Sequence, residues 1–93
     1  MKFQLRVNRH SPDDGFIDYL FGPSYFIGNL FDRLYTFVQG QSFSDEYRTQ
    51  VAAKLNKFND TVQDPNSPWL MNFTVTNGPG YVDSYFLEIV EEG

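Results

Sequence analysis

The residues of this chain that could do chemistry are few. The only histidine, His10, is followed by Ser11, Pro12, Asp13 and Asp14. A histidine beside carboxylates has the composition of an oriented general base, and two adjacent aspartates offer oxygen ligands to a divalent cation. The stretch also has the composition of an exposed turn, and it lacks the spaced ligand series of a calcium loop. We therefore expect neither a catalytic residue nor a metal site here.

The rest of the inventory gives enzyme chemistry little to work with. The chain has no cysteine, which excludes disulfides, thiolate nucleophiles and cysteine-bound metals. The sequence NGPG at residues 77–80 connects two predicted strands, and no lysine follows it, so it is not a phosphate-binding loop. We expect no cofactor and a protein that is not an enzyme, with a small enzyme of unknown chemistry as the last alternative.

The charges are distributed unevenly along the chain. The formal net charge is −5, yet all seven lysines and arginines lie at or before Lys57, where six acids nearly balance them. The remaining six acids have no cation after them: Asp60, Asp64, Asp83, Glu88, Glu91 and Glu92. Complementary charge steers association, so this distribution predicts a protein partner with a basic surface.

A basic patch for nucleic acid is the competing interpretation of the charges. Five cations could contribute to it: Lys2, Arg6, Arg9, Lys54 and Lys57. An acidic protein, however, repels phosphate at long range. If the first and last strands are neighbours, Lys2 or Arg6 can instead pair with Glu88. We therefore expect no direct nucleic-acid binding.

Targeting signals are absent from the sequence. The first ten residues alternate apolar and polar side chains, unlike a signal peptide, and no apolar run approaches the length of a membrane span. We expect a soluble, cytoplasmic protein without membrane contact. The 93 residues suffice for a single domain over residues 1–93.

Alternation of apolar and polar residues predicts the strands. Residues 1–8 and 69–76 alternate as half-buried strands do, and a turn joins the latter to a closing strand at residues 81–91. Residues 16–21 form a candidate second strand after the HSPDDG turn.

Two helices are predicted between the strands. The first begins at Gly22-Pro23-Ser24 and ends at Gly40, with a wide apolar stripe that includes Phe26 and Phe37. The second begins after Ser44, and its narrower stripe predicts a position further from the core. The predicted fold is α+β: an antiparallel sheet of three or four strands in the order β-(β)-α-α-β-β, with a helical hairpin on one face.

The closing strand gives the clearest indication of function. If Tyr85, Leu87 and Ile89 face the core, then Phe86 and Glu88 face away, and the opposite choice exposes other apolar residues. Either way apolar groups lie on the face that the helices do not cover, and an apolar patch rimmed by acids is typical of a protein-binding surface.

Three alternatives compete for this patch: burial in a homodimer, a central strand covered on both faces, and singly exposed residues without a role. The leading hypothesis is a small acidic protein that binds and blocks or modulates a basic macromolecule, as inhibitors, immunity proteins and phage anti-defence proteins do. A sharper form has its carboxylates mimic DNA phosphates on a nucleic-acid-binding protein. The alternative is a structural or assembly subunit that self-associates through the apolar sheet face. The predicted binding residues are Asp60, Asp64, Asp83, Phe86, Glu88, Glu91 and Glu92.

Overall fold

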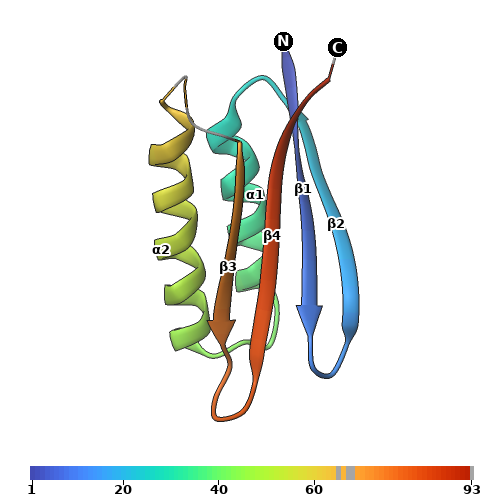
Figure 1. Ribbon diagram of the computed structural model, residues 1–93, viewed down its shortest axis with the longest axis vertical. Coiled ribbons are helices and arrows are strands. Elements are labelled where there is room, and N and C mark those ends of the chain that lie inside the picture. Colours follow the sequence, from blue (N-terminus) through green and yellow to red (C-terminus); the bar gives the residue numbers. More distant parts are fainter. Residues whose placement is uncertain (65, 67–68, 93) are drawn as a thin grey trace.

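The chain folds into one four-stranded antiparallel sheet and two helices (Figure 1). The computed structural model describes residues 1–64, 66 and 69–92. In chain order the elements are β1 (Lys2–Ser11), β2 (Gly15–Ser24), α1 (Ile27–Gln39), α2 (Asp45–Val62), β3 (Leu70–Thr76) and β4 (Val82–Glu92). The predicted α+β fold with its helical hairpin is confirmed, and residues 16–21 belong to a full-length strand.

The sheet has the strand order β2-β1-β4-β3, so the first and last strands form its centre. In the register between them Arg6 pairs with Glu88 and Asn8 with Phe86. The hairpins β1–β2 and β3–β4 place one further strand on each side. The first and last strands are therefore neighbours, which is the condition for a pairing of Arg6 with Glu88.

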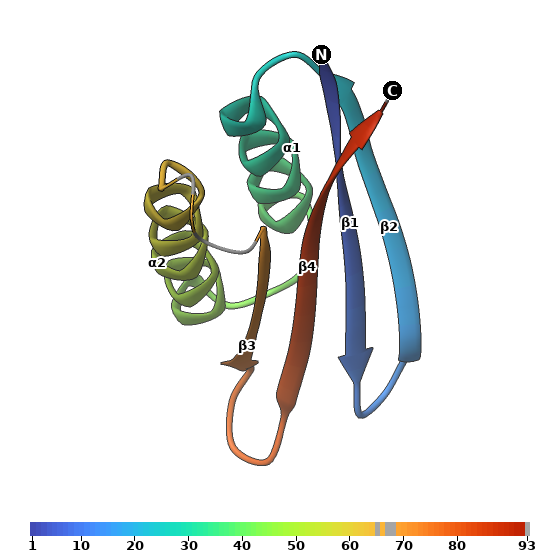
Figure 2. The same cartoon turned by 45° about the horizontal axis from the view of Figure 1, so that its top comes forward.

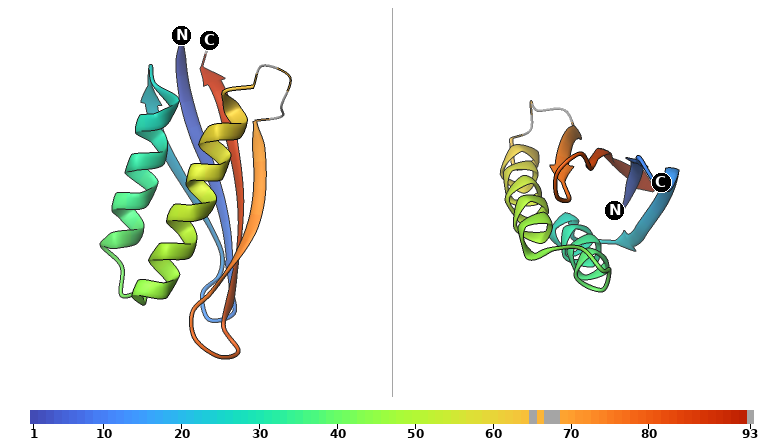
Figure 3. Two further views of the ribbon diagram at one scale, coloured as in Figure 1. Left: turned by 90° about the vertical axis from the view of Figure 1, so that its left-hand side faces the viewer. Right: turned by 90° about the horizontal axis from the view of Figure 1, so that it is seen from below.

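The two helices lie side by side on one face of the sheet, and in the described part of the chain no helix lies on the other face (Figures 2 and 3). Alternate residues of β1 and β4 point toward the helices and are buried, among them Leu5, Val7, Leu87 and Ile89. The residues between them point toward the bare face, because successive side chains of a strand alternate.

The first helix begins later than the sequence predicts. Strand β2 continues to Ser24, which pairs with Phe3, and α1 begins at Ile27. The Ser24 hydroxyl accepts a hydrogen bond from the Phe26 amide at 3.2 Å, which organises the connection. The predicted helix start at Pro23 is thus wrong: local preference for proline in a first helical turn is outweighed by strand pairing. Phe26, assigned to the apolar stripe, is 71% exposed.

The second helix is as deeply buried as the first, contrary to the prediction from its narrower stripe. Tyr47, Val51 and Phe58 are fully buried within the core. The large side chains of α2 compensate for its narrow apolar stripe, because one aromatic ring buries as much surface as several small residues. Phe58 also packs against Phe31 of α1, with ring centroids 5.3 Å apart.

Candidate functional site

The uncovered side of the sheet is the most extensive candidate site. We call it the open sheet face and define it by three rows of paired, outward-pointing residues, one from each strand in the order β2, β1, β4, β3. The rows are Leu20–Arg6–Glu88–Leu70, Asp18–Asn8–Phe86–Asn72 and Phe16–His10–Ser84–Thr74.

Large apolar side chains of the open sheet face are accessible to a partner. Phe16 is 83% exposed and Leu20 60% exposed on the edge strand β2, and Leu70 is 46% exposed on the opposite edge. Phe86, 42% exposed, lies between them on a central strand. These residues share one side of one sheet, with polar residues such as Arg6 and Glu88 between them. Apolar side chains gathered on one face and rimmed by polar groups commonly mark interaction sites.

The open sheet face carries one base, Arg6, and two acids, Glu88 and Asp18. Arg6 and Glu88 form an ion pair at 3.6 Å across β1 and β4, with side chains 63% and 37% exposed. Such an exposed pair contributes little to stability, on the order of 0–1 kcal/mol, and leaves both groups available to a partner. His10 stacks on Phe16 with ring centroids 4.3 Å apart. The face therefore combines four exposed apolar side chains with one ion pair and one acid, Asp18, for which the described residues provide no ion pair.

A second candidate site is a buried polar cluster between the sheet and α2. Arg9 and Asp83, 7% and 4% exposed, form an ion pair in which Nη2 and Nε of Arg9 lie 2.9 Å and 3.0 Å from Asp83 Oδ2. The hydroxyl of Tyr47 donates to the same oxygen at 2.6 Å, and the hydroxyl of Tyr85 lies 2.5 Å from the hydroxyl of Tyr47. Phe43 covers the guanidinium, with its ring centroid 5.0 Å from Arg9 Cζ.

The ionisation of this cluster follows from its burial. Burial raises the pKa of Tyr47, and the hydrogen bond to Asp83 raises it further. Burial likewise raises the pKa of Tyr85. For Arg9, burial opposes the charge, but the hydrogen bond with Tyr19 and the carboxylate of Asp83 outweigh it, so the pKa of Arg9 is raised. The cluster is a charged pair surrounded by neutral phenols that hold their protons, which makes it a structural link and not a poised acid or base.

Two hollows adjoin the helices. One, of about 250 Å³, lies beside Arg9 and Asp83 and is lined by Asp13, Asp14 and Tyr81 among others. Arg9 is already paired, so this hollow offers no free cation to an anionic ligand.

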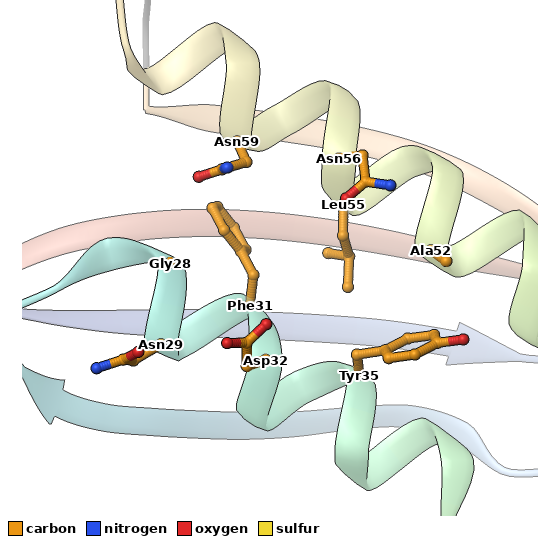
Figure 4. A pocket seen from close by; sticks show the side chains of 9 residues that line it. All are labelled: Gly28, Asn29, Phe31, Asp32, Tyr35, Ala52, Leu55, Asn56 and Asn59. Carbon is orange, nitrogen blue, oxygen red and sulfur yellow. The ribbon is translucent and has the colours of Figure 1, made fainter.

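The larger hollow, of about 470 Å³, is the groove between α1 and α2. Phe31 and Leu55 point toward one another across it, with Asn56 and Asn59 along the α2 side (Figure 4). Phe31 and Leu55 are 5% and 4% exposed, so the groove has a closed apolar floor and only a polar rim.

The structure distributes the seven predicted binding residues over three places. Phe86 and Glu88 lie on the open sheet face. Asp83 is buried against Arg9 and so does not face a partner. The other four lie in or just after the C-terminal parts of α2 and β4, which are at the same end of the molecule (Figure 1): Asp60, Asp64, Glu91 and Glu92. Glu92 pairs with Lys2 in the register of β1 and β4 and points to the same side of the sheet as Glu88. Over the described ranges none of these four forms an ion pair.

Sequence reasoning missed the edge-strand residues of the open sheet face. Phe16 and Leu20 alternate with Ile17 and Tyr19 along β2. This period of two could have shown that Phe16 and Leu20 point away from the core, but the predicted strand at residues 16–21 is not assigned a side of the sheet. Arg9 and Asp83 were missed as a pair although each continues the core-facing alternation of its strand.

Metal sites, membrane spans and relatives add no further candidate. Among the described residues, no group of three or more histidine, aspartate or glutamate side chains is arranged to hold a metal ion. No helix of the described part combines the length and apolar character needed to cross a membrane. No protein family, curated protein or solved structure matches the chain.

Proposed function

We propose that this protein is a non-enzymatic interaction domain that docks its open sheet face on another protein. The observation that carries the proposal is the group of four exposed apolar side chains, Phe16, Leu20, Leu70 and Phe86, on the one sheet face without helices. Aromatic anchors surrounded by polar groups are the usual composition of interface hot spots.

The size of the open sheet face fits a specific interface. The four strands have 10, 10, 11 and 7 residues; at about 3.3 Å per residue and about 4.8 Å between strands, the whole bare side of the sheet covers about 600 Å² of flat area, and the three rows of the open sheet face form its middle part. The relief of the side chains adds to this value. A stable interface of standard size buries about 800 Å² on each partner, so the face is of the right order.

The charges of the face define the partner's chemistry. Arg6 and Glu88 neutralise one another at its centre. A partner that carries only basic groups would meet Arg6 unfavourably, because like charges at an interface cost several kcal/mol. The occupant of this face is therefore a protein surface with apolar groups that presents one acid opposite Arg6, one base opposite Glu88 and no acid opposite Asp18.

Absence of enzymatic activity is supported by the pairing within the buried polar cluster. Asp83 Oδ2 accepts from Arg9 and Tyr47, and Tyr47 also contacts Tyr85. A general base needs a lone pair directed at substrate, and this oxygen directs its lone pairs at Arg9 and Tyr47.

Docking on a basic macromolecule is a second candidate function, and the acidic end of the molecule favours it. Four carboxylates without an ion pair in the described part of the chain lie there, from two different elements: Asp60, Asp64, Glu91 and Glu92. Lys2 and Lys57 dilute the excess of negative charge. This geometry supports mimicry of DNA phosphates less well, because Asp83 is buried against Arg9 and Glu88 is paired with Arg6.

A matched pair of phenylalanine variants tests the leading proposal. Phe16 on the open sheet face is 83% exposed, and Phe26, outside the sheet, is 71% exposed. Affinity capture from the source cells would compare the tagged wild type with Phe16→Asp and Phe26→Asp. We expect wild type and Phe26→Asp to retain a captured protein, either a different protein or an untagged copy of this chain. Phe16→Asp should lose it.

Salt and charge reversal separate the two candidate functions. Binding through the open sheet face persists at high salt, whereas binding through the acidic end weakens because salt screens exposed charges. Reversal of Asp60 on α2 and Glu91 on β4 to lysine, neither of which points to the side of the open sheet face, should leave the first unchanged and weaken the second. Equal capture by wild type and Phe16→Asp would show that the face is not the docking surface.

A further inference from the structure

We infer that the occupant of the open sheet face is a second copy of this chain, packed face to face about a two-fold axis parallel to the strands. The inference rests on the proposed function, because it names the partner of the same face. It is carried by the order of residues within each row of the sheet, which makes the face complementary to itself.

A two-fold axis along the strands reverses each row at constant height. It places β1 opposite β4 of the second copy and β2 opposite its β3, because the strand order is β2-β1-β4-β3. In the row Leu20–Arg6–Glu88–Leu70, Arg6 then meets Glu88 of the second copy, and Leu20 meets its Leu70. By symmetry each contact occurs twice, so this row forms two ion pairs and two leucine–leucine contacts between the copies.

The other two rows contain no conflict in this arrangement. Asn8 meets Phe86 of the second copy, and the acidic Asp18 meets its neutral Asn72. In the third row Phe16 meets Thr74 of the second copy and His10 meets its Ser84. No two like charges face one another in these three rows.

An axis across the strands gives a worse match. Through the first row, it sets Arg6 against Arg6 and Glu88 against Glu88 of the second copy. Through the second row, it sets Asp18 against Asp18. Like charges directly opposed in an interface are destabilising, so the self-complementarity belongs to the axis along the strands.

Sheet geometry allows this packing. Two twisted sheets pack face to face at about 30° with their surfaces about 10 Å apart. Register between facing strands is therefore kept best near the centre, where Arg6, Asn8, Phe86 and Glu88 lie on the central strands β1 and β4. Phe86, at 42% exposure, lies where interface hot spots concentrate.

Sedimentation equilibrium of the purified chain tests for the dimer. We expect wild type and Phe26→Asp to form dimers, and Phe16→Asp and Leu20→Asp to sediment as monomers with unchanged circular dichroism. Each copy carries a formal charge of −5, so added salt should leave the dimer unchanged or tighten it. Folded wild type that stays monomeric at high concentration overturns the inference.

Charge exchange between copies tests the pairing. With Arg6→Glu alone, the new glutamate of each copy faces Glu88 of the other copy. With Glu88→Arg alone, the new arginine of each copy faces Arg6 of the other copy. Each should weaken self-association by about tenfold or more, which corresponds to about 1.4 kcal/mol. Mixed together, the two variants restore both opposite-charge pairs, and a dimer of one copy of each should form. A mixture no tighter than either variant alone overturns the pairing.

The direction of the axis has its own control. The double exchange Arg6→Glu with Glu88→Arg keeps every pair opposite in charge and should dimerise with itself but not with wild type. Association of the double exchange with wild type in preference to itself would indicate an axis across the strands. A monomeric wild type whose heterologous capture is still lost with Phe16→Asp would refute the dimer and leave the proposed function intact.

Discussion

Removal of the Asp83 carboxylate gives the most quantitative test of the buried polar cluster. The carboxylate accepts from Arg9 and Tyr47 at 3.0 Å and 2.6 Å, and the guanidinium that would lose its counter-ion is 7% exposed. Breaking a buried pair by removing one partner costs about 3–5 kcal/mol, because it leaves an uncompensated charge. Domains of this size have a total stability of about 5–15 kcal/mol. Asp83→Ala should therefore lower the free energy of unfolding by a large fraction.

Asp14 provides the matched control on the same guanidinium. Its carboxylate lies 3.7 Å from Nη2 of Arg9, but its side chain is 56% exposed, and exposed pairs contribute about 0–1 kcal/mol. Thermal unfolding monitored by the fluorescence of Trp69 measures both variants. At about 4–8 °C per kcal/mol for a domain of this length, Asp83→Ala should melt at least about 12 °C below wild type. A loss no greater than that of Asp14→Ala would refute the assignment of the cluster as a structural link.

Two further predictions concern pH and backbone geometry. Burial and the hydrogen bond to Asp83 raise the pKa of Tyr47. The folded protein therefore keeps the phenol proton at a pH where the unfolded chain loses it, above about pH 10. Because the unfolded state then binds fewer protons, the free energy of unfolding is unaffected below that pH and falls above it. Tyr47→Phe should make this alkaline fall shallower in urea unfolding, and an equally steep fall would contradict it. Gly22 has φ of +121°, and a Cβ there would lie 2.9 Å from the Phe3 carbonyl oxygen. Gly22→Ala should therefore lower the free energy of unfolding by about 1–3 kcal/mol. Gly28→Ala is the control, because nothing lies within 4 Å of its Cβ, and it should leave the melting temperature unchanged or raise it.

The order of the elements was predictable because the local patterns agree with the tertiary structure. Phe3, Leu5 and Val7 alternate with polar residues, and their side of β1 is the side that faces the helices. The hairpin of β3 and β4 has a glycine-rich turn between two alternating runs. In these segments backbone propensity and burial favour the same conformation, and sequence reasoning succeeds where they do.

The start of α1 was not predictable from local signals. Pro23 favours a helical first turn by its fixed φ, but Ser24 is held in β2 by pairing with Phe3, some 20 residues earlier in the sequence. A contact of that separation leaves no trace in a window of neighbouring residues.

The role of Asp83 was hidden for a different reason. It belongs to the acid-rich part of the chain, which suggested a surface position, and its partner Arg9 lies 74 residues away. Both residues do continue the inward alternation of their strands, Arg9 after Leu5 and Val7, and Asp83 before Tyr85. Two opposite charges in core-facing phase on adjacent strands are the signal that identifies such a pair from sequence.

The central claim is that the open sheet face is covered when this protein docks. Relaxation of side-chain methyl groups by a soluble paramagnetic probe measures that directly, with Leu20 and Leu70 on the face and the exposed Ala53 of α2 as control. Between dilute and concentrated samples, the account predicts that the probe's effect on Leu20 and Leu70 falls sharply while its effect on Ala53 is unchanged. An effect on both leucines that stays constant at every concentration, and also in the presence of any captured protein, would contradict it.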